Sequence, residues 1–425
     1  MNDGMMIIPS TIQKVYVELA NSTYDWPFVV LLLLAELLLG TIIILKVPYT
    51  EIDWEAYMQE VDFWWIEGEY DYRNIYGGTG PLVYPAGFLY LFRVLQYVTD
   101  REIPKAQVLF LGFYVATQAV AMILYNLTLR QTRKQFTSEK SISHNELSVC
   151  HTIWSFRIAM GCLCLSKRYH SIFLLRLFND GPTMLMAYLS FWCFVTQRWN
   201  VGCFLFSLAV SLKMNVLLFA PGLLYLLLQN SLIMTIPRLA ICGITQLVVG
   251  APFLLRHPVS YLRKAFELDR QFFYKWTVNF KFLPEEVFLS KSWAIFLLVL
   301  HLVLLTIYHY NLYKYRSGDV GPKQTVSTLF ISNFVGICCA RTLHYQFYSW
   351  YFAALPFLLW QETTYPLPVR ILLLAAIEYA FLTFPATPLS SAVLQITHWA
   401  ILIPCVLLLR KTSIPIQEKE ESKRN

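Results

Sequence analysis

Charged residues are scarce in this sequence. Only 14% of its 425 residues are charged, 56% are hydrophobic, and the mean hydropathy is positive. This balance excludes an ordinary soluble domain. Apolar runs of near the length that crosses a bilayer, about 20 residues, recur along the chain and leave little of it for a separate soluble domain. The sequence therefore predicts an all-α polytopic membrane protein with about twelve transmembrane helices.

Several other features are missing. The nine cysteines form no CxxC pair and lie in apolar runs, so we expect neither a zinc site nor a disulfide framework. The glycine-rich segment 77–81 lacks the Gly-Lys-Ser/Thr ending of a nucleotide-binding loop. Lysines and arginines are scattered over short loops, which is typical of membrane topology signals and not of nucleic-acid binding. No cleavable signal peptide is evident before the first apolar run, at Phe28, and we expect an uncleaved anchor.

The apolar runs predict a weakly structured lead at 1–27, one membrane domain at 28–410 and a charged tail at 411–425. Within that domain we expect a polar first loop at 48–81 and a long aromatic and basic loop at 252–289. Spans are predicted at 28–47, about 82–98 and 108–129. Simple alternation then puts the basic stretch 130–148 on the same side as the acidic first loop, against the positive-inside tendency. Either one segment is re-entrant or the tendency is overridden.

The stretch 49–87 carries eight acidic residues and one basic residue, Arg73, and is too polar to cross a bilayer. Trp54, Tyr57, Met58, Val61 and Trp65 recur at helical spacing, which predicts an amphipathic helix along the headgroups. The glycines of 77–81 would let the backbone approach a ligand closely before the chain turns back.

Asp53 stands at the start of that predicted helix. A carboxylate in such a loop could act as a general base that takes the proton from an attacking hydroxyl, and Asp53 is the candidate base. The competing interpretation is a helix N-cap, which is the commoner role of such a residue. Glu51 and Glu55 flank it as supporting charges, and a bound divalent ion is the less favoured alternative because hard cations need several oxygen ligands.

Two further groups could carry chemistry. Arg341, His344 and Tyr345 follow a late span and suit a lipid phosphate, although interfacial snorkelling beside an aromatic belt explains them equally well. Charges inside apolar sequence indicate a polar cavity, unless Arg176 and Asp180 simply pair along one helix. These weaker substrate-binding candidates are Lys167, Arg168, His170, Arg176, Asn179, Asp180 and Lys213.

Two other features have open interpretations. Glu36, inside the first span, is either functional or bonded to a neighbouring helix. The basic and aromatic residues of 263–281 could bind sugars and phosphates, but we favour contact with headgroups.

Six segments, taken in order, resemble one family. They are TEIDWEAYM, GGTGPLVYPAGF, HSIFLLRLFND, SLKMNVLLFAP, RQFFYKWTVNFKFLP and LHYQFYSWYFAALPFLLW. From about Val47 to Gln361 the chain resembles the dolichyl-phosphate-mannose-dependent α-1,3-mannosyltransferases of the asparagine-linked glycosylation pathway. The resemblance implies a GT-C fold in the endoplasmic reticulum membrane, with lumenal chemistry and cytosolic termini.

The resemblance also implies the reaction. Mannose would pass from dolichyl phosphate mannose to a five-mannose dolichol-pyrophosphate oligosaccharide, forming an α-1,3 bond with inversion. Asp53 falls on the expected base, and Arg341 and His344 would hold the donor phosphate. We expect no metal cofactor, no nucleic acid and no obligate protein partner beyond membrane lipids and the two lipid-linked substrates. The alternatives are a related transferase with another acceptor, or a lipid or sugar transporter, against which the acidic first loop and the lack of a visible repeat both count.

Overall fold

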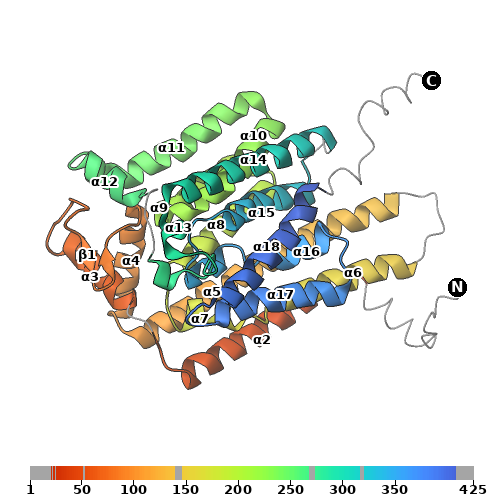
Figure 1. Cartoon of the computed structure of the whole chain (residues 1–425), viewed down its shortest axis with the longest axis horizontal. Coiled ribbons are helices and arrows are strands. Elements are labelled where there is room, and N and C mark those ends of the chain that lie inside the picture. Colours follow the sequence, from red (N-terminus) through yellow and green to blue (C-terminus); the bar gives the residue numbers. More distant parts are fainter. Residues whose placement is uncertain are drawn as a thin grey trace.

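The structure, a computed structural model, describes residues 21, 23, 25–50, 53–138, 146–267, 273–315 and 320–407, with the side chains of 134–138, 146–149 and 315 excluded. Helices dominate this part of the chain (Figure 1). The first half contains α2 (Asp25–Lys46), α3 (Asp53–Trp65), α4 (Ala86–Thr99), α5 (Ile103–Ser138), α6 (Glu146–Cys162), α7 (Lys167–Leu174), α8 (Asp180–Val195) and α9 (Trp199–Leu212). The second half contains η2 (Met214–Phe219), α10 (Ala220–Asn230), α11 (Leu232–Leu254), α12 (Pro258–Ala265), η3 (Tyr274–Trp276), α13 (Glu285–Leu289), α14 (Lys291–Tyr315), α15 (Pro322–Cys338), η4 (Tyr345–Trp350), α16 (Ala354–Gln361), α17 (Leu367–Leu382) and α18 (Pro388–Leu407).

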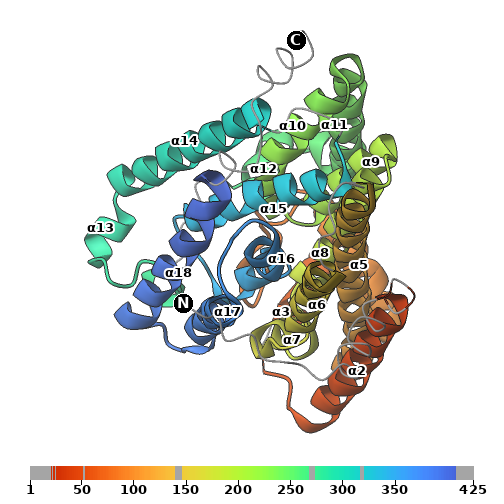
Figure 2. The same cartoon turned by 90° about the vertical axis from the view of Figure 1, so that its right-hand side faces the viewer.

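The predicted all-α polytopic membrane architecture is confirmed. Among the described residues, five helices are long and apolar enough to span a bilayer: Asp25–Lys46, Ile103–Arg133, Leu232–Leu254, Lys291–Lys314 and Pro388–Leu407. Figure 2 shows α2 and α14 on opposite flanks of the bundle. Both present exposed apolar side chains, such as Leu38 on α2 and Leu298 on α14, which are typical of a lipid-facing surface. The expected total of about twelve spans stays a prediction.

The interpretation of residues 82–98 as a membrane span is wrong. Helix α4 lies along α3 over its length, with the Tyr57 and Phe88 rings 5.2 Å apart and Gln96 donating to Asp62 at 3.0 Å. Figure 1 shows both helices with α12 at one end of the bundle, hereafter the α3 end. A helix of 14 residues is about 21 Å long at the usual rise, which is too short to cross a bilayer core of about 30 Å.

This placement resolves the topological conflict in the sequence. Helix α5 begins near α3, where Trp54 Nε1 donates to the Arg101 carbonyl at 2.9 Å. It ends beside the start of α2, where Arg133 pairs with Asp25 at 3.0 Å. Arg133, near the start of the basic stretch, therefore lies at the end of the bundle opposite α3. Of the two alternatives, the structure supports a segment that does not cross.

The expected headgroup-facing side of α3 packs against protein instead. Trp54, Tyr57, Met58 and Val61 are buried in a cluster with residues of α4 and with Phe110, and only Trp65 is largely exposed. Burying each such side chain contributes about 1.5–3 kcal/mol, so this face fixes α3 to the bundle. The helix is held in one orientation, with Asp53 at its first turn.

The glycine-rich segment forms a short hairpin, β1 (Tyr76–Gly77) paired antiparallel with β2 (Gly80–Pro81). A Cβ on Gly77 would lie 2.4 Å from the Ala56 carbonyl oxygen, and Gly80 adopts a φ of +130°. The close approach that Gly77 permits is therefore to the backbone of α3, and an approach of the other glycines to a ligand stays a prediction.

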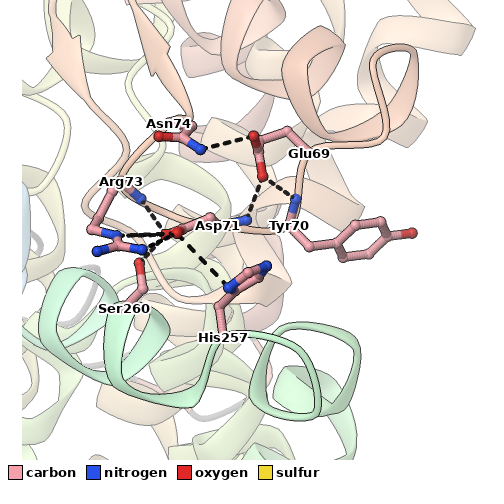
Figure 3. A network of polar contacts seen from close by, with 7 residues as sticks. All are labelled: Glu69, Tyr70, Asp71, Arg73, Asn74, His257 and Ser260. Carbon is pink, nitrogen blue, oxygen red and sulfur yellow. Dashed lines mark hydrogen bonds and ion pairs between the residues drawn. The ribbon is translucent and has the colours of Figure 1, made fainter.

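A polar network attaches the chain between α3 and this hairpin to α12 (Figure 3). The Asp71 carboxylate accepts hydrogen bonds from the Arg73 side chain and from the Ser260 hydroxyl of α12, and His257 Nδ1 lies 3.8 Å away. Glu69 accepts from the backbone N–H groups of Tyr70 and Asp71 at 2.8 and 2.7 Å. Because Asp71 is bonded in its charged form, chiefly by Arg73, its pKa lies well below the ordinary value. The predicted loop 252–289 contains two short helices, α12 and α13.

Candidate active site

A cavity of about 530 Å³ opens between η2, α14 and the residues around the α15–η4 junction. Its polar lining residues are Tyr84, Lys213, Asn215, Glu267, His301, Arg341, Gln346 and Trp350. Apolar side chains, among them Leu217, Leu218, Leu297 and Leu298, complete the wall. This volume lies within the range of about 300–1,000 Å³ typical of small-molecule sites. An apolar wall with a few convergent polar groups suits a lipid-linked headgroup.

Lys213 supplies a fixed positive charge at this wall. It follows the last turn of α9 in an extended conformation, and its Nζ donates to Asn179 Oδ1 and Asp180 Oδ2, both at 2.8 Å. Asp180 opens α8, where the helix dipole favours a carboxylate, and it is fully buried. Its second oxygen accepts from Trp350 Nε1. The ion pair is therefore buried with both carboxylate oxygens bonded, which holds the ammonium in place.

The alternative pairing of Arg176 with Asp180 along one helix is wrong. The chain between them is not continuous helix, because α7 ends at Leu174 and α8 begins at Asp180. Arg176 Nη1 donates to the Ser171 hydroxyl, while Asp180 pairs with Lys213, 33 residues further along the chain. The prediction of broken helices beside a polar cavity fits this arrangement.

Aromatic rings cover the same wall. Lys213 Nζ lies 5.4 Å from the Tyr84 ring centroid and 5.7 Å from that of Trp350, within the range of cation–π attraction. The Phe347 and Trp350 rings stack with centroids 3.8 Å apart. Such ring faces are suited to the apolar C–H surfaces of a sugar.

Of the three predicted phosphate-binding residues, one lines the cavity and two do not. Arg341 lines the cavity, and its Nη2 donates to the Leu289 carbonyl at 2.7 Å, which orients the guanidinium. His344 and Tyr345 follow Arg341 by three and four positions in the sequence, but they do not line the cavity. The Tyr345 hydroxyl donates to the Thr383 carbonyl at 2.8 Å, and the Arg168 guanidinium carbon lies 4.9 Å from its ring centroid. Phosphate contact by His344 and Tyr345 stays a prediction.

Asp53 does not line the cavity. It is the first residue of α3 and is partly exposed to solvent. Burial raises the pKa of Tyr57, one turn along α3, well above its ordinary value, and the nearby Tyr84, Asp53 and Asp180 raise it further. The Tyr57 and Tyr84 ring centroids are 6.0 Å apart, and Tyr84 lines the cavity. The carboxylates of Asp53 and Asp180 therefore both disfavour ionisation of Tyr57, whose ring packs against Tyr84 of the cavity lining.

The other predicted site residues lie elsewhere. His170 Nε2 lies 2.8 Å from Glu36 in a buried cluster, and Arg168 Nε donates to the Phe381 carbonyl at 2.8 Å. Lys167 and Glu55 are exposed. Glu51 lies outside the described residues.

Sequence reasoning did not assign a site role to Tyr84, Asn215, Glu267, His301, Gln346 or Trp350. Tyr84 and Trp350 stand in aromatic-rich segments that are indistinguishable by local pattern from an interfacial belt. Within the described ranges, no group of three or more His, Cys, Asp or Glu side chains is placed to hold a metal ion. The absence of a metal cofactor stays a prediction. All nine cysteines are free thiols in the structure.

Comparison with known proteins gives one result. A family model described as ALG3 protein matches residues 30–391. The chain is 43% identical to a Mus musculus protein over 92% of its own length and 89% of that protein's, and 44% identical to a Homo sapiens protein over 88% and 84%. Both are named Dol-P-Man:Man(5)GlcNAc(2)-PP-Dol alpha-1,3-mannosyltransferase. A Dictyostelium discoideum protein named as a probable enzyme of that type is 42% identical over 88% and 89%.

Proposed function

Because this chain belongs to the ALG3 protein family, we propose that it transfers mannose from dolichyl phosphate mannose to Man5GlcNAc2-diphosphate-dolichol through an α-1,3 bond. The structural observation that supports this proposal is the cavity, because Lys213 and Arg341 line it together with aromatic and aliphatic side chains. Two cations suit a lipid phosphate, and rings suit the attached sugar.

In the proposed reaction, the acceptor 3-hydroxyl oxygen attacks the anomeric carbon of the donor as the bond from that carbon to the phosphate oxygen breaks. The hydroxyl proton passes to Asp53, and dolichyl phosphate leaves with the bonding electrons. A single displacement inverts a β-linked donor to an α-linked product. The partial exposure of Asp53 suits this role, because the acceptor oligosaccharide must arrive from water.

Lys213 and Arg341 stabilise the negative charge that grows on the leaving phosphate. Both are held by the protein beforehand, Lys213 by Asp180 and Arg341 by the Leu289 carbonyl, so little reorganisation is needed as the bond breaks. A monophosphate with two such cations has less need of a metal ion than a nucleotide diphosphate has. We therefore propose a metal-independent reaction.

We place the enzyme in the endoplasmic reticulum membrane with the α3 end in the lumen. The acidic residues of α3 lie at that end, and Arg133 and Arg157 lie at the other, where both pair with Asp25. This distribution agrees with the positive-inside tendency. The GT-C fold assignment is part of the same proposal.

Purified protein in detergent tests the function directly. Radiolabelled dolichyl phosphate mannose is offered with isolated five-, six- and seven-mannose acceptors, with and without chelator. We expect label only in the product of the five-mannose acceptor, at an unchanged rate with chelator. Preference for another acceptor would identify a different transferase, and loss of activity with chelator would refute metal independence. No product from any acceptor would favour the transporter alternative.

A further inference from the structure

Asn215 is a buried residue of the cavity lining. It stands in η2, two residues after Lys213, and only 8% of its surface is exposed. Within the part of the chain that the structure describes, neither its amide oxygen nor its amide nitrogen has a hydrogen-bond partner. A buried amide left in this state costs free energy, because its bonds to water are lost without replacement.

Other buried amides behave differently. The side-chain amide of Asn279 is bonded at both atoms, since its nitrogen donates to the carbonyl of the cavity-lining Ala340 and its oxygen accepts from the Leu343 N–H, both at 2.8 Å. Asn126 and Gln395 also have both amide atoms without a partner within the described residues, but neither lines the cavity. Asn215 therefore combines two hydrogen-bonding atoms that have no partner within the described residues with a place in the cavity lining.

The chemistry of the amide limits what it can bind. Its oxygen only accepts and its nitrogen only donates, whereas ionised phosphate oxygens only accept, so a phosphate would leave the amide oxygen unused. A hydroxyl both donates and accepts, so two neighbouring hydroxyls of a hexose can satisfy both atoms at once. The phosphate already has suitable partners in Lys213 and Arg341 on the same wall.

We propose that Asn215 binds two neighbouring hydroxyls of the donor's mannosyl group and thereby favours the mannose-bearing lipid phosphate over the bare lipid phosphate. This assignment rests on the proposed function. The cavity volume of about 530 Å³ suits one sugar phosphate headgroup and not the complete acceptor oligosaccharide, which is why the donor is the expected ligand.

The test measures thermal unfolding of the purified full chain with dolichyl phosphate or dolichyl phosphate mannose, for the wild type and for Asn215→Leu. Without lipid, the variant should be at least as stable as the wild type, because an unsatisfied amide is replaced by an apolar group of similar size. Dolichyl phosphate should stabilise both proteins equally, and the additional stabilisation by the mannosyl lipid should be lost in the variant. The donor KM should rise about tenfold, the size expected for two neutral hydrogen bonds, with the acceptor KM unchanged.

The matched control is Asn126→Leu, which removes a similarly unbonded buried amide away from the cavity and should leave the response to both lipids unchanged. Asn215→Ala is the second variant if leucine prevents folding. Retention of the additional stabilisation by Asn215→Leu or Asn215→Ala would overturn the assignment. An equal loss of the response to both lipids would place Asn215 at the phosphate and would also overturn it. A wild type that responds to neither lipid would refute the proposed function itself.

Discussion

The structure contains two buried pairs of an acidic and a basic residue, Asp180 with Lys213 and Glu36 with His170, and their surroundings differ. Lys213 lines the cavity and pairs with Asp180 at 2.8 Å. Glu36 accepts from the Tyr114 hydroxyl and lies 2.8 Å from His170 Nε2, joining α2, α5 and α7. None of these three residues lines the cavity. Both clusters are charges in apolar sequence, which sequence reasoning treats alike. Access to a cavity, and not burial of charge, is what separates a site from a structural contact.

The largest expected effect is that of Asp53→Asn, because it removes the proposed base. Asn caps a helix as well as Asp does, so folding should be unchanged. Turnover should fall by about 10²–10⁴-fold, the usual contribution of general base catalysis. The measurement is the transfer rate with purified enzyme at saturating donor and acceptor. Normal turnover in this variant would leave Asp53 as a cap only.

Lys213→Met should affect both stability and activity. It leaves the Asp180 carboxylate buried without its cation, which should cost about 3–5 kcal/mol of unfolding free energy. The double variant Lys213→Met/Asp180→Asn should recover much of this stability but not activity, because the phosphate still lacks a cation. Unfolding in denaturant and donor KM are the two measurements. Full recovery of activity in the double variant would show that Lys213 is structural, like Glu36.

Glu36→Ala tests the opposite side of the comparison. The Tyr114 hydroxyl and His170 lose a shared partner, so stability should fall by about 1–3 kcal/mol. The donor and acceptor KM values should stay within about twofold of the wild type, a difference below about 0.5 kcal/mol. Unfolding and steady-state kinetics measured on one preparation check both parts. A rise of KM without a loss of stability would show that Glu36 contributes to substrate binding, which would contradict this prediction.

The smallest expected effect is the pH dependence of the contact in Figure 3. The Asp71 pKa is lowered in the folded protein, chiefly by its hydrogen bonds with Arg73, so its stabilisation is complete above the ordinary pKa. It is lost as the pH falls through the lowered folded value. Limited proteolysis of residues 66–75 should therefore accelerate in acid, and Asp71→Asn should show the faster cleavage already at neutral pH. Cleavage of the wild type that does not change on acidification would contradict this account.

Much of the molecule could be predicted from residue patterns. Apolar runs predicted a helical membrane protein because a bilayer core requires helices with internally bonded backbones. The polar stretch after the first span predicted a helix beginning at Asp53 because its apolar residues recur at helical spacing.

The packing and ion-pair partners of individual residues could not be predicted in the same way. Helical spacing identifies the apolar face of α3 but not whether lipid or α4 covers it, and the apolar content of residues 82–98 does not reveal a helix that stays at one end. The pairing of Asp180 with Lys213 joins residues far apart in sequence.

By itself, therefore, the sequence determined the fold class, the membrane environment and which side chains could carry charge to a phosphate. Those properties follow from composition and short-range periodicity, which act within a few turns of chain. Only the tertiary structure decided that Lys213, Arg341, Asn215 and Trp350 share one cavity while Glu36 and His170 do not. The physical reason is that helix packing places residues from separate helices together, and no local pattern specifies which faces meet.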